Sequence, residues 1–379
     1  MKSFLFIPCL FLMTLCFSGV LFALPGVVKV GVINASHYQP YSKSNSKPYN
    51  VAMLLGKSYA LDKGIKTQYK FFYYDVGSLS SFYTALKKLK AWRADFVIGP
   101  NSSNDFLLLK NHFKNMLIVS PYASSSAVGK LSKDYYSFVY PAKNAAETFA
   151  TFCATKFPNQ GVYSIVEADC KSCLDFSKYF ADFFSKDKKK KIVTKYFIYD
   201  NAKNIDIKRL LSDYRDGDII LLPNRSLSSA TLMAKITDYL GRPMVFLGSD
   251  FWGSWNKSEV GKIAAKSPYV GYYIVPWSLD NTANRDLKTY VKYFKDRYSS
   301  LPEDRLTFSV FVSFISVINA YVKYYSNEDL KNLKTREKIL RAFILSNSVN
   351  KDQYRPKNYS IFKVTQGGEK FYRSVPVIR

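Results

Sequence analysis

The chain has 379 residues, of which 47% are hydrophobic and 22% are charged. This balance excludes a disordered or low-complexity chain, and the length predicts two domains, or one large one, with room for a sizeable core. Lys and Arg number 55 against 29 Asp and Glu, which gives a net charge of +26, so the compartment must be known before the charge can be assigned to a partner.

The first 23 residues have the pattern of a secretory signal peptide. Lys2 is the only charge before Lys29, and residues 4–23 are almost continuously apolar. We expect cleavage after Ala23, with cleavage after Ser18 or a retained membrane anchor as alternatives. The sequence therefore predicts a periplasmic or otherwise extracytoplasmic protein. There nucleic acid is not an expected partner, whereas anionic lipids, acidic wall polymers and anionic solutes are.

Strand-like and helix-like segments alternate after the signal. Strands are predicted at 27–33, 69–74, 96–98 and 116–119, with helices at 51–62, 79–92 and 105–113 between them. A second series has helices at 144–156, 174–185, 204–214 and 228–240 and strands at 161–166, 192–198, 218–222 and 244–247. Short apolar strands that alternate with amphipathic helices are typical of parallel sheets. The fold class predicted is therefore α/β, with two open parallel-sheet lobes.

The last third of the chain continues with a strand at 269–275 and then turns helical. Helices are predicted at 284–298, 307–325 and 335–344, and a closing hairpin at 359–365 and 369–377. The uncharged run 306–322 is about as long as a short membrane span. Because it contains Ser, Thr and Asn side chains, we interpret it as a buried core helix.

The sequence contains little material for enzyme chemistry. His37 and His112 are the only histidines, and neither stands in a metal-like spacing. The chain also lacks the glycine-rich phosphate loops of nucleotide-binding proteins. We therefore expect no metal, no cofactor and no catalytic activity.

Three cysteines remain after the signal. Cys170 and Cys173 lie between a strand and a helix, a position seen in redox enzymes, but export favours a local disulfide. Cys153 precedes that strand, whose length at ~3.3 Å per residue separates it from Cys170 by roughly 20 Å, beyond the ~7 Å limit for bridging. Cys153 is therefore predicted to be a buried thiol.

Polar loops follow several of the predicted strands. Ser103 belongs to the loop 99–104, and Ser124 to the loop 120–126. Hydroxyls and backbone N–H groups at a strand end suit an anion such as a carboxylate, although helix caps and turns use the same residues. Asp250 follows another strand beside Phe251 and Trp252, where it is either a helix cap or the counter-charge of an ammonium group walled by aromatic rings.

The order of these segments resembles the type I periplasmic solute-binding proteins, in particular the leucine/isoleucine/valine-binding receptors of ABC transporters. The blocks that carry the resemblance are Asp95-Phe96-Val97-Ile98-Gly99, Leu117-Ile118-Val119-Ser120-Pro121 and Phe246-Leu247-Gly248-Ser249-Asp250. The resemblance implies that Ser103, Ala123 and Ser124 hold a ligand carboxylate and that Asp250 holds an ammonium group. It also places an aromatic first loop at His37, Tyr38 and Tyr41.

The chain departs from this family at several positions. Asp250 stands where the family usually has Glu, Tyr122 replaces a small residue, and no tyrosine near Lys171 matches the family's second-lobe tyrosine. Two further residues are included as candidate ligand contacts. Tyr122 is one of these departures, and Trp252 is one of the aromatic rings beside Asp250.

The resemblance also implies a hinge of three crossings between the lobes. These fall near 139–143, at either 248–252 or 275–277, and at 347–350. The expected first lobe is 24–140 plus 278–347, and the second is 141–277 plus 348–379. Such a protein is expected to be a monomer that closes on an amino-acid-like ligand and delivers it to an ABC permease. The alternative is a sensory or regulatory module of the same fold, such as an activator of cell-wall synthases.

Overall fold

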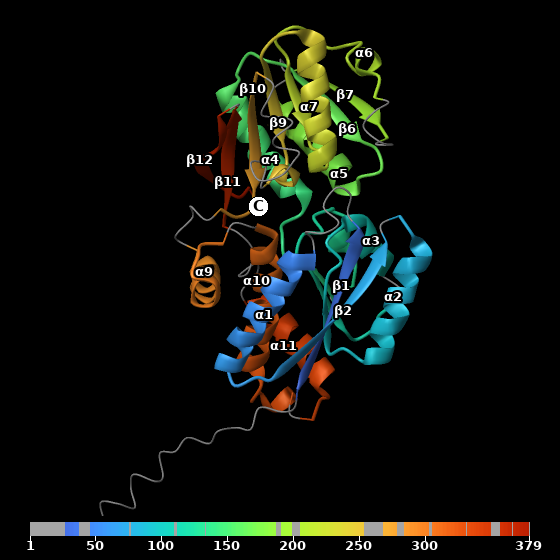
Figure 1. The fold of residues 1–379 in the computed structure, drawn as a ribbon, viewed down its shortest axis with the longest axis vertical. Coiled ribbons are helices and arrows are strands. Elements are labelled where there is room, and N and C mark those ends of the chain that lie inside the picture. The colour runs from blue at the N-terminus through green and yellow to red at the C-terminus, as the bar shows by residue number, and fades with distance from the viewer. Residues whose placement is uncertain are drawn as a thin grey trace, which may run out of the picture.

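The computed structural model describes residues 27–37, 46–75, 77–109, 112–132, 134–186, 191–198, 205–253, 268–278, 284–302, 305–330, 332–349, 357–365 and 367–378. The predicted signal peptide and the candidate contacts Tyr38 and Tyr41 lie outside these residues. The described chain forms two lobes, each built on one open sheet flanked by helices (Figure 1). The predicted α/β class with two parallel-sheet lobes is confirmed.

The first lobe contains a five-stranded parallel sheet in the order β2-β1-β3-β4-β5. Its strands are β1 (Val28–His37), β2 (Thr67–Asp75), β3 (Phe96–Ile98), β4 (Leu117–Ser120) and β5 (Tyr135–Ser137). Its helices are α1 (Ser46–Asp62), α2 (Leu79–Trp92), α3 (Ser103–Leu108), α9 (Arg285–Tyr298), α10 (Arg305–Tyr324) and α11 (Thr335–Val349).

The side chains of each strand alternate between the two faces of the sheet, and these helices cover one face or the other. Phe96 and Ile98 of β3 face one core, which α1, α9, α10 and α11 cover, whereas Val97 faces the core formed with α2 and α3. Because successive side chains of a strand point to opposite faces, a short apolar strand fills both cores at once. This explains why β3 and β4 are apolar without a polar alternation.

The second lobe contains a seven-stranded sheet in the order β12-β11-β10-β9-β8-β6-β7. Its strands are β6 (Val162–Glu167), β7 (Ile192–Phe197), β8 (Ile219–Leu222), β9 (Met244–Gly248), β10 (Tyr269–Val275), β11 (Asn358–Thr365) and β12 (Gly368–Pro376). Strands β6 to β10 are parallel, and β11 and β12 form the expected antiparallel hairpin. One face packs on α4 (Ala142–Lys156) and α5 (Lys171–Phe184), the other on α6 (Ile207–Leu210) and α7 (Ser226–Leu240).

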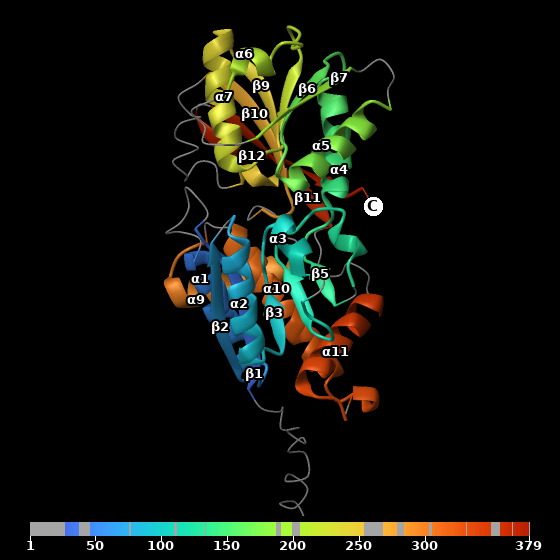
Figure 2. The same cartoon turned by 90° about the vertical axis from the view of Figure 1, so that its right-hand side faces the viewer.

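The chain passes between the lobes where its elements change sheet. It enters the second lobe between β5 and α4, returns between β10 and α9, and crosses again between α11 and β11. Since β9 and β10 are neighbours in the second sheet, the crossing near 248–252 is wrong and the one near 275–277 is right. Figure 2 shows the two lobes stacked, with α3 and α5 at the boundary between them.

Helix α10 is the one described helix that is long and apolar enough to cross a membrane. The stretch Leu306–Tyr324 has a mean hydropathy of 1.6 but is 78% buried inside the protein. Two of its serine hydroxyls are satisfied within the helix, since Ser313 Oγ donates to the Ser309 carbonyl at 2.7 Å and Ser316 Oγ to the Ser313 carbonyl at 2.9 Å. The prediction of a buried core helix is confirmed.

Candidate ligand-binding pocket

Two loops of the first lobe are tied together where β3 and β4 end. Gly99 has a φ of 91°, and a Cβ at this position would collide with the Ile33 carbonyl of β1, so only glycine lets the chain turn here. At the end of β4, Ser120 Oγ donates to the Pro100 carbonyl at 2.6 Å and accepts from the Ala123 N–H at 2.9 Å. The loop after β4 is therefore fixed to the loop after β3.

Ser103 strengthens this arrangement. It begins α3, is buried, and its Oγ accepts a hydrogen bond from the Ser125 N–H at 3.0 Å. Ser124 is also buried, and its carbonyl accepts from the Ala142 N–H at the start of α4. In this structure Ser103 supports the neighbouring loop, and Ala123 lies in the core beneath it.

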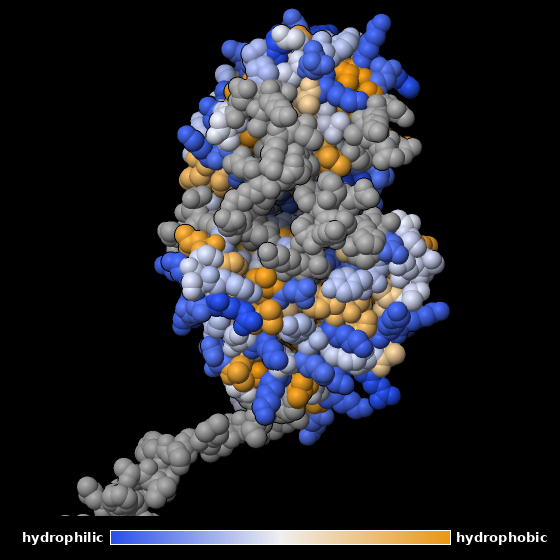
Figure 3. All heavy atoms as spheres, in the orientation of Figure 1, coloured by the Kyte–Doolittle hydropathy of each residue, from blue (hydrophilic) through white to orange (hydrophobic). Residues whose placement is uncertain are grey.

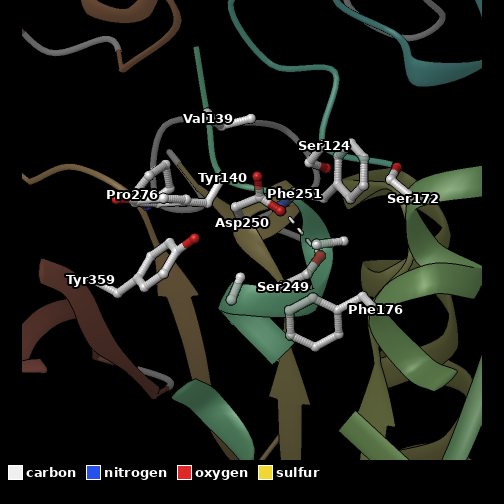
Figure 4. Close-up of a pocket in the computed structure, with 12 residues that line it drawn as sticks. Ser124, Val139, Tyr140, Ser172, Phe176, Ser249, Asp250, Phe251, Pro276 and Tyr359 are labelled. Atoms are coloured by element: carbon white, nitrogen blue, oxygen red, sulfur yellow. Dashed lines mark hydrogen bonds between the residues drawn. The ribbon is translucent and has the colours of Figure 1, made fainter. Parts of the chain in front are cut away.

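A pocket lies at the boundary of the two lobes (Figure 4). From the first lobe and the first crossing it receives Ser124, Val139 and Tyr140, and from the second lobe polar and aromatic side chains of α5, β11 and the segment after β9. The second-lobe set is Ser172, Phe176, Ser249, Asp250, Phe251 and Tyr359. The pocket thus combines hydroxyls, one carboxylate and aromatic walls, which is the composition of a small-molecule site.

Asp250 is the ionisable group at the centre of this pocket. Figure 4 shows its carboxylate among the lining residues, with Tyr359 on one side and Ser124 on the other. Burial raises the pKa of Asp250 to about 6, and hydrogen bonds from the backbone N–H groups of Asp250 and Phe251 partly oppose that rise. No ion pair to Asp250 is present within the described ranges. A partly desolvated carboxylate of this kind is suited to a cationic ligand group.

Two other candidate contacts do not line the pocket. Trp252 is fully buried in the core of the second lobe, where its Nε1 donates to the Leu222 carbonyl at 3.0 Å. Its neighbour Phe251 supplies the aromatic wall instead. Tyr122 packs edge-on against Trp277, with ring centroids 6.3 Å apart, at the margin of the first-lobe core. The sequence identified aromatic residues near the pocket but did not show whether each ring points into the pocket or into the core.

An ionic cluster at the end of β6 was not predicted. The fully buried Glu167 pairs with the Arg225 guanidinium, which also lies 3.2 Å from Asp169. Glu167 Oε2 accepts from Ser228 Oγ at 3.1 Å, and Asn224 Oδ1 accepts from the Glu167 N–H at 2.7 Å. Burial raises the pKa of Glu167, and the Arg225 charge opposes this. The available signal was an acid at the end of β6 and an arginine shortly after β8, which pairs with β6 in the sheet.

The cysteine chemistry is local. Cys170 and Cys173 form a disulfide with Cα atoms 5.2 Å apart, in the turn that starts α5, and Cys153 is a buried cysteine outside this disulfide. Within the part of the chain that the structure describes, no group of three His, Cys, Asp or Glu side chains is placed to hold a metal ion.

Comparisons by sequence found no match to a family model and none to a curated protein. Solved structures do match over nearly the whole chain. The leucine-binding protein LivK from Thermotoga maritima is 15% identical, with a TM-score of 0.74 over 92% of this chain and 99% of that one. LivJ from Streptococcus pneumoniae in complex with isoleucine is 15% identical, with a TM-score of 0.69 over 93% and 99%.

Ligands differ among the structures that match. A solute-binding protein of an ABC transporter from R. palustris, solved in complex with benzoate, is 12% identical, with a TM-score of 0.70 over 93% of this chain and 98% of that one. These identities are too low to carry ligand contacts from one protein to another. The chain therefore has the fold of the type I periplasmic binding proteins, as the resemblance implied.

Proposed function

We propose that this protein is an extracytoplasmic solute-binding receptor that closes its two lobes on a small ligand and presents it to an ABC permease. The observation that carries the proposal is the pocket lined from both lobes, at the carboxyl ends of β4 and β9. Open α/β sheets bind ligands at these strand ends. The fold shared with leucine-binding and isoleucine-bound receptors supports the same class.

The ligand that fits these residues is an amino acid or a related zwitterion. Asp250 supplies a carboxylate for the ammonium group, and Ser124 supplies a hydroxyl from the opposite lobe for the ligand carboxylate. The rings of Phe176, Phe251 and Tyr359 would surround an apolar ligand side chain. Ser103 and Ala123 act in this scheme by holding the loop that carries Ser124.

Entry of such a ligand requires the lobes to separate. The pocket has a cavity volume of only about 10 Å³, about enough for one water molecule. The three crossings provide the hinge for this motion. Binding would then draw the open population towards a closed state that a permease recognises.

A thermal-shift screen against amino acids, amides and short peptides tests the proposal. A ligand at 100 times its Kd adds ~2.7 kcal/mol to the stability of the native state. Calorimetry with the hit should show Asp250→Ala and Asp250→Asn binding roughly 30-fold to several thousand-fold more weakly, since losing one partner of a buried charge pair costs ~2–5 kcal/mol. Asp238→Asn, at an exposed acid on α7, is the matched control.

Four outcomes would count against the proposal or against one part of it. Wild-type affinity in Asp250→Asn, or hits that all lack a cationic group, would exclude the zwitterion while leaving the receptor. Binding without compaction in small-angle scattering would instead favour the regulatory module of the same fold. Failure of the protein to stimulate any permease and ATPase encoded beside it would remove the transport role.

A further inference from the structure

A largely buried acid of the second lobe binds directly to the first lobe. Asp175 lies on α5 in the second lobe with a side chain only 14% exposed. Its Oδ2 accepts hydrogen bonds from Ser125 Oγ at 2.7 Å and from the Ser126 N–H at 2.9 Å, both in the loop after β4 of the first lobe. A second-lobe carboxylate therefore occupies hydroxyl and amide donors of the first-lobe serine loop.

A second contact joins the same helix to the first lobe. Asn104 of α3 donates from Nδ2 to the Asp169 carbonyl at 2.8 Å, and its Oδ1 accepts from the Lys171 N–H at 3.2 Å. One side chain thereby bridges the turn that leads into α5. Both figures of the fold place α3 and α5 together at the boundary (Figures 1 and 2).

Each side of this contact is also held by bonds within its own lobe. In the first lobe, Ser125 is fixed by its N–H bond to Ser103 Oγ at 3.0 Å, and its own Oγ accepts from the Ala127 N–H at 3.2 Å. In the second lobe, the Cys170–Cys173 disulfide closes the first turn of α5, and Cys173 lies two residues before Asp175. Lys171 Nζ lies 3.6 Å from Asp175 Oδ1 and keeps the carboxylate on that side of the helix. Little ordering is therefore left to oppose the contact.

We propose that Asp175 is an internal latch, a carboxylate on the second lobe that binds the Ser125–Ser126 loop and raises the closed population of the ligand-free protein, while ligand is still needed to close the rest. A hydrogen bond to a charged group is stronger than a neutral one, and this carboxylate makes two of them across the boundary. A fraction of the ligand-free protein is then already closed, ligand draws the remaining open molecules into the same state, and opening requires the latch to break. The Ser103 hydroxyl acts in this device by orienting Ser125.

Small-angle scattering of ligand-free protein tests the latch without reference to any ligand. Wild-type protein should have the smaller radius of gyration, and Asp175→Ala should lower the ratio of closed to open molecules about tenfold. Asp175→Asn, which keeps one acceptor oxygen but no charge, should lie between the two. Asp182→Ala, at an exposed acid on the same helix, is the control and should match wild type.

A second variant, in the opposite lobe, distinguishes loss of this contact from misfolding of the Asp175 variant. Ser125→Ala removes the donor from the opposite lobe and should open the protein in the same direction, and Asp175→Ala with Ser125→Ala should open it no further than Asp175→Ala alone. Circular dichroism should show native secondary structure in each. Equal radii of gyration in wild type and both single variants would overturn the latch, even if a ligand is later shown to close the pocket. Additive opening by the two substitutions would also overturn it.

Discussion

The guanidinium of Arg225 pairs with the carboxylate of Glu167, which is fully buried at the end of β6. Removing the arginine leaves a desolvated carboxylate with only neutral donors, which costs ~3–5 kcal/mol for a buried pair. We therefore expect Arg225→Met to lower the free energy of unfolding by about that amount, as measured by chemical denaturation.

Arg242 offers the matched control for that substitution. Its guanidinium pairs with Asp216, whose side chain is 87% exposed, and exposed pairs contribute ~0–1 kcal/mol. Arg242→Met should therefore change stability little. If the two arginine variants have the same stability, the Glu167 pair is not a structural element of the second lobe.

The sequence located the pocket better than it identified the residues in it. Asp250 and Ser124 were found because each follows a strand, and the carboxyl ends of parallel strands meet at one edge. The direction in which each aromatic side chain points was not predictable. Phe251 and Trp252 are adjacent, and only the packing of Trp252 against Gly248 decides which ring enters the core. Tyr359 was not found because it arrives from β11, more than one hundred residues later in the chain.

Asp250 should make the stability of the protein depend on pH. Its pKa in the folded state, about 6, lies above the ordinary aspartate value of 3.8, so the folded state holds the proton more tightly than the unfolded state. This group's contribution is therefore full below about pH 4 and is lost as the pH rises through 6, a change of up to ~3 kcal/mol. Asp250→Asn cannot titrate and should lack this loss, which denaturation at pH 4, 5, 6 and 7 measures. Parallel curves for the two proteins would contradict the raised pKa.

The element order was predictable over most of the chain because the strands are short, apolar and ended by Gly or Pro. The lengths of the helices were less predictable than the order of the elements. The helix predicted at 204–214 is only Ile207–Leu210, where Asp206 caps the Arg209 N–H at 3.0 Å, and the helix predicted at 105–113 ends at Leu108. Strand β5 was missed because three residues, held by the Tyr135 hydroxyl on the Leu109 carbonyl at 2.7 Å, give no periodic pattern.

The Cys170–Cys173 disulfide should add little to global stability. In the chain-entropy view a loop this short contributes only about 2 kcal/mol. The intact mass of protein from its native compartment should be two hydrogens below the reduced value, and Cys153 alone should be alkylated after unfolding. Cys170→Ser with Cys173→Ser should fold and lower the denaturation midpoint modestly. Alkylation of all three thiols would exclude the bridge.

Gly248 and Trp252 should behave as a coupled pair that sets the position of Asp250. A Cβ at Gly248 would overlap the indole of Trp252, four residues further along the chain, and the short helical turn Asp250–Trp252 connects that indole to the pocket. Overpacking of this kind typically costs ~1–3 kcal/mol, so Gly248→Ala should be destabilised and should also shift Asp250. Gly367→Ala is the control, because the nearest atom to its Cβ would be Thr365 Oγ1 at 3.7 Å.

Trp252→Leu removes the ring that the new methyl group meets, so the double variant should be more stable than the sum of the two single effects predicts. Strict additivity in this double-mutant cycle would show that the glycine is required for another reason, and that the indole does not hold the Asp250 turn in place.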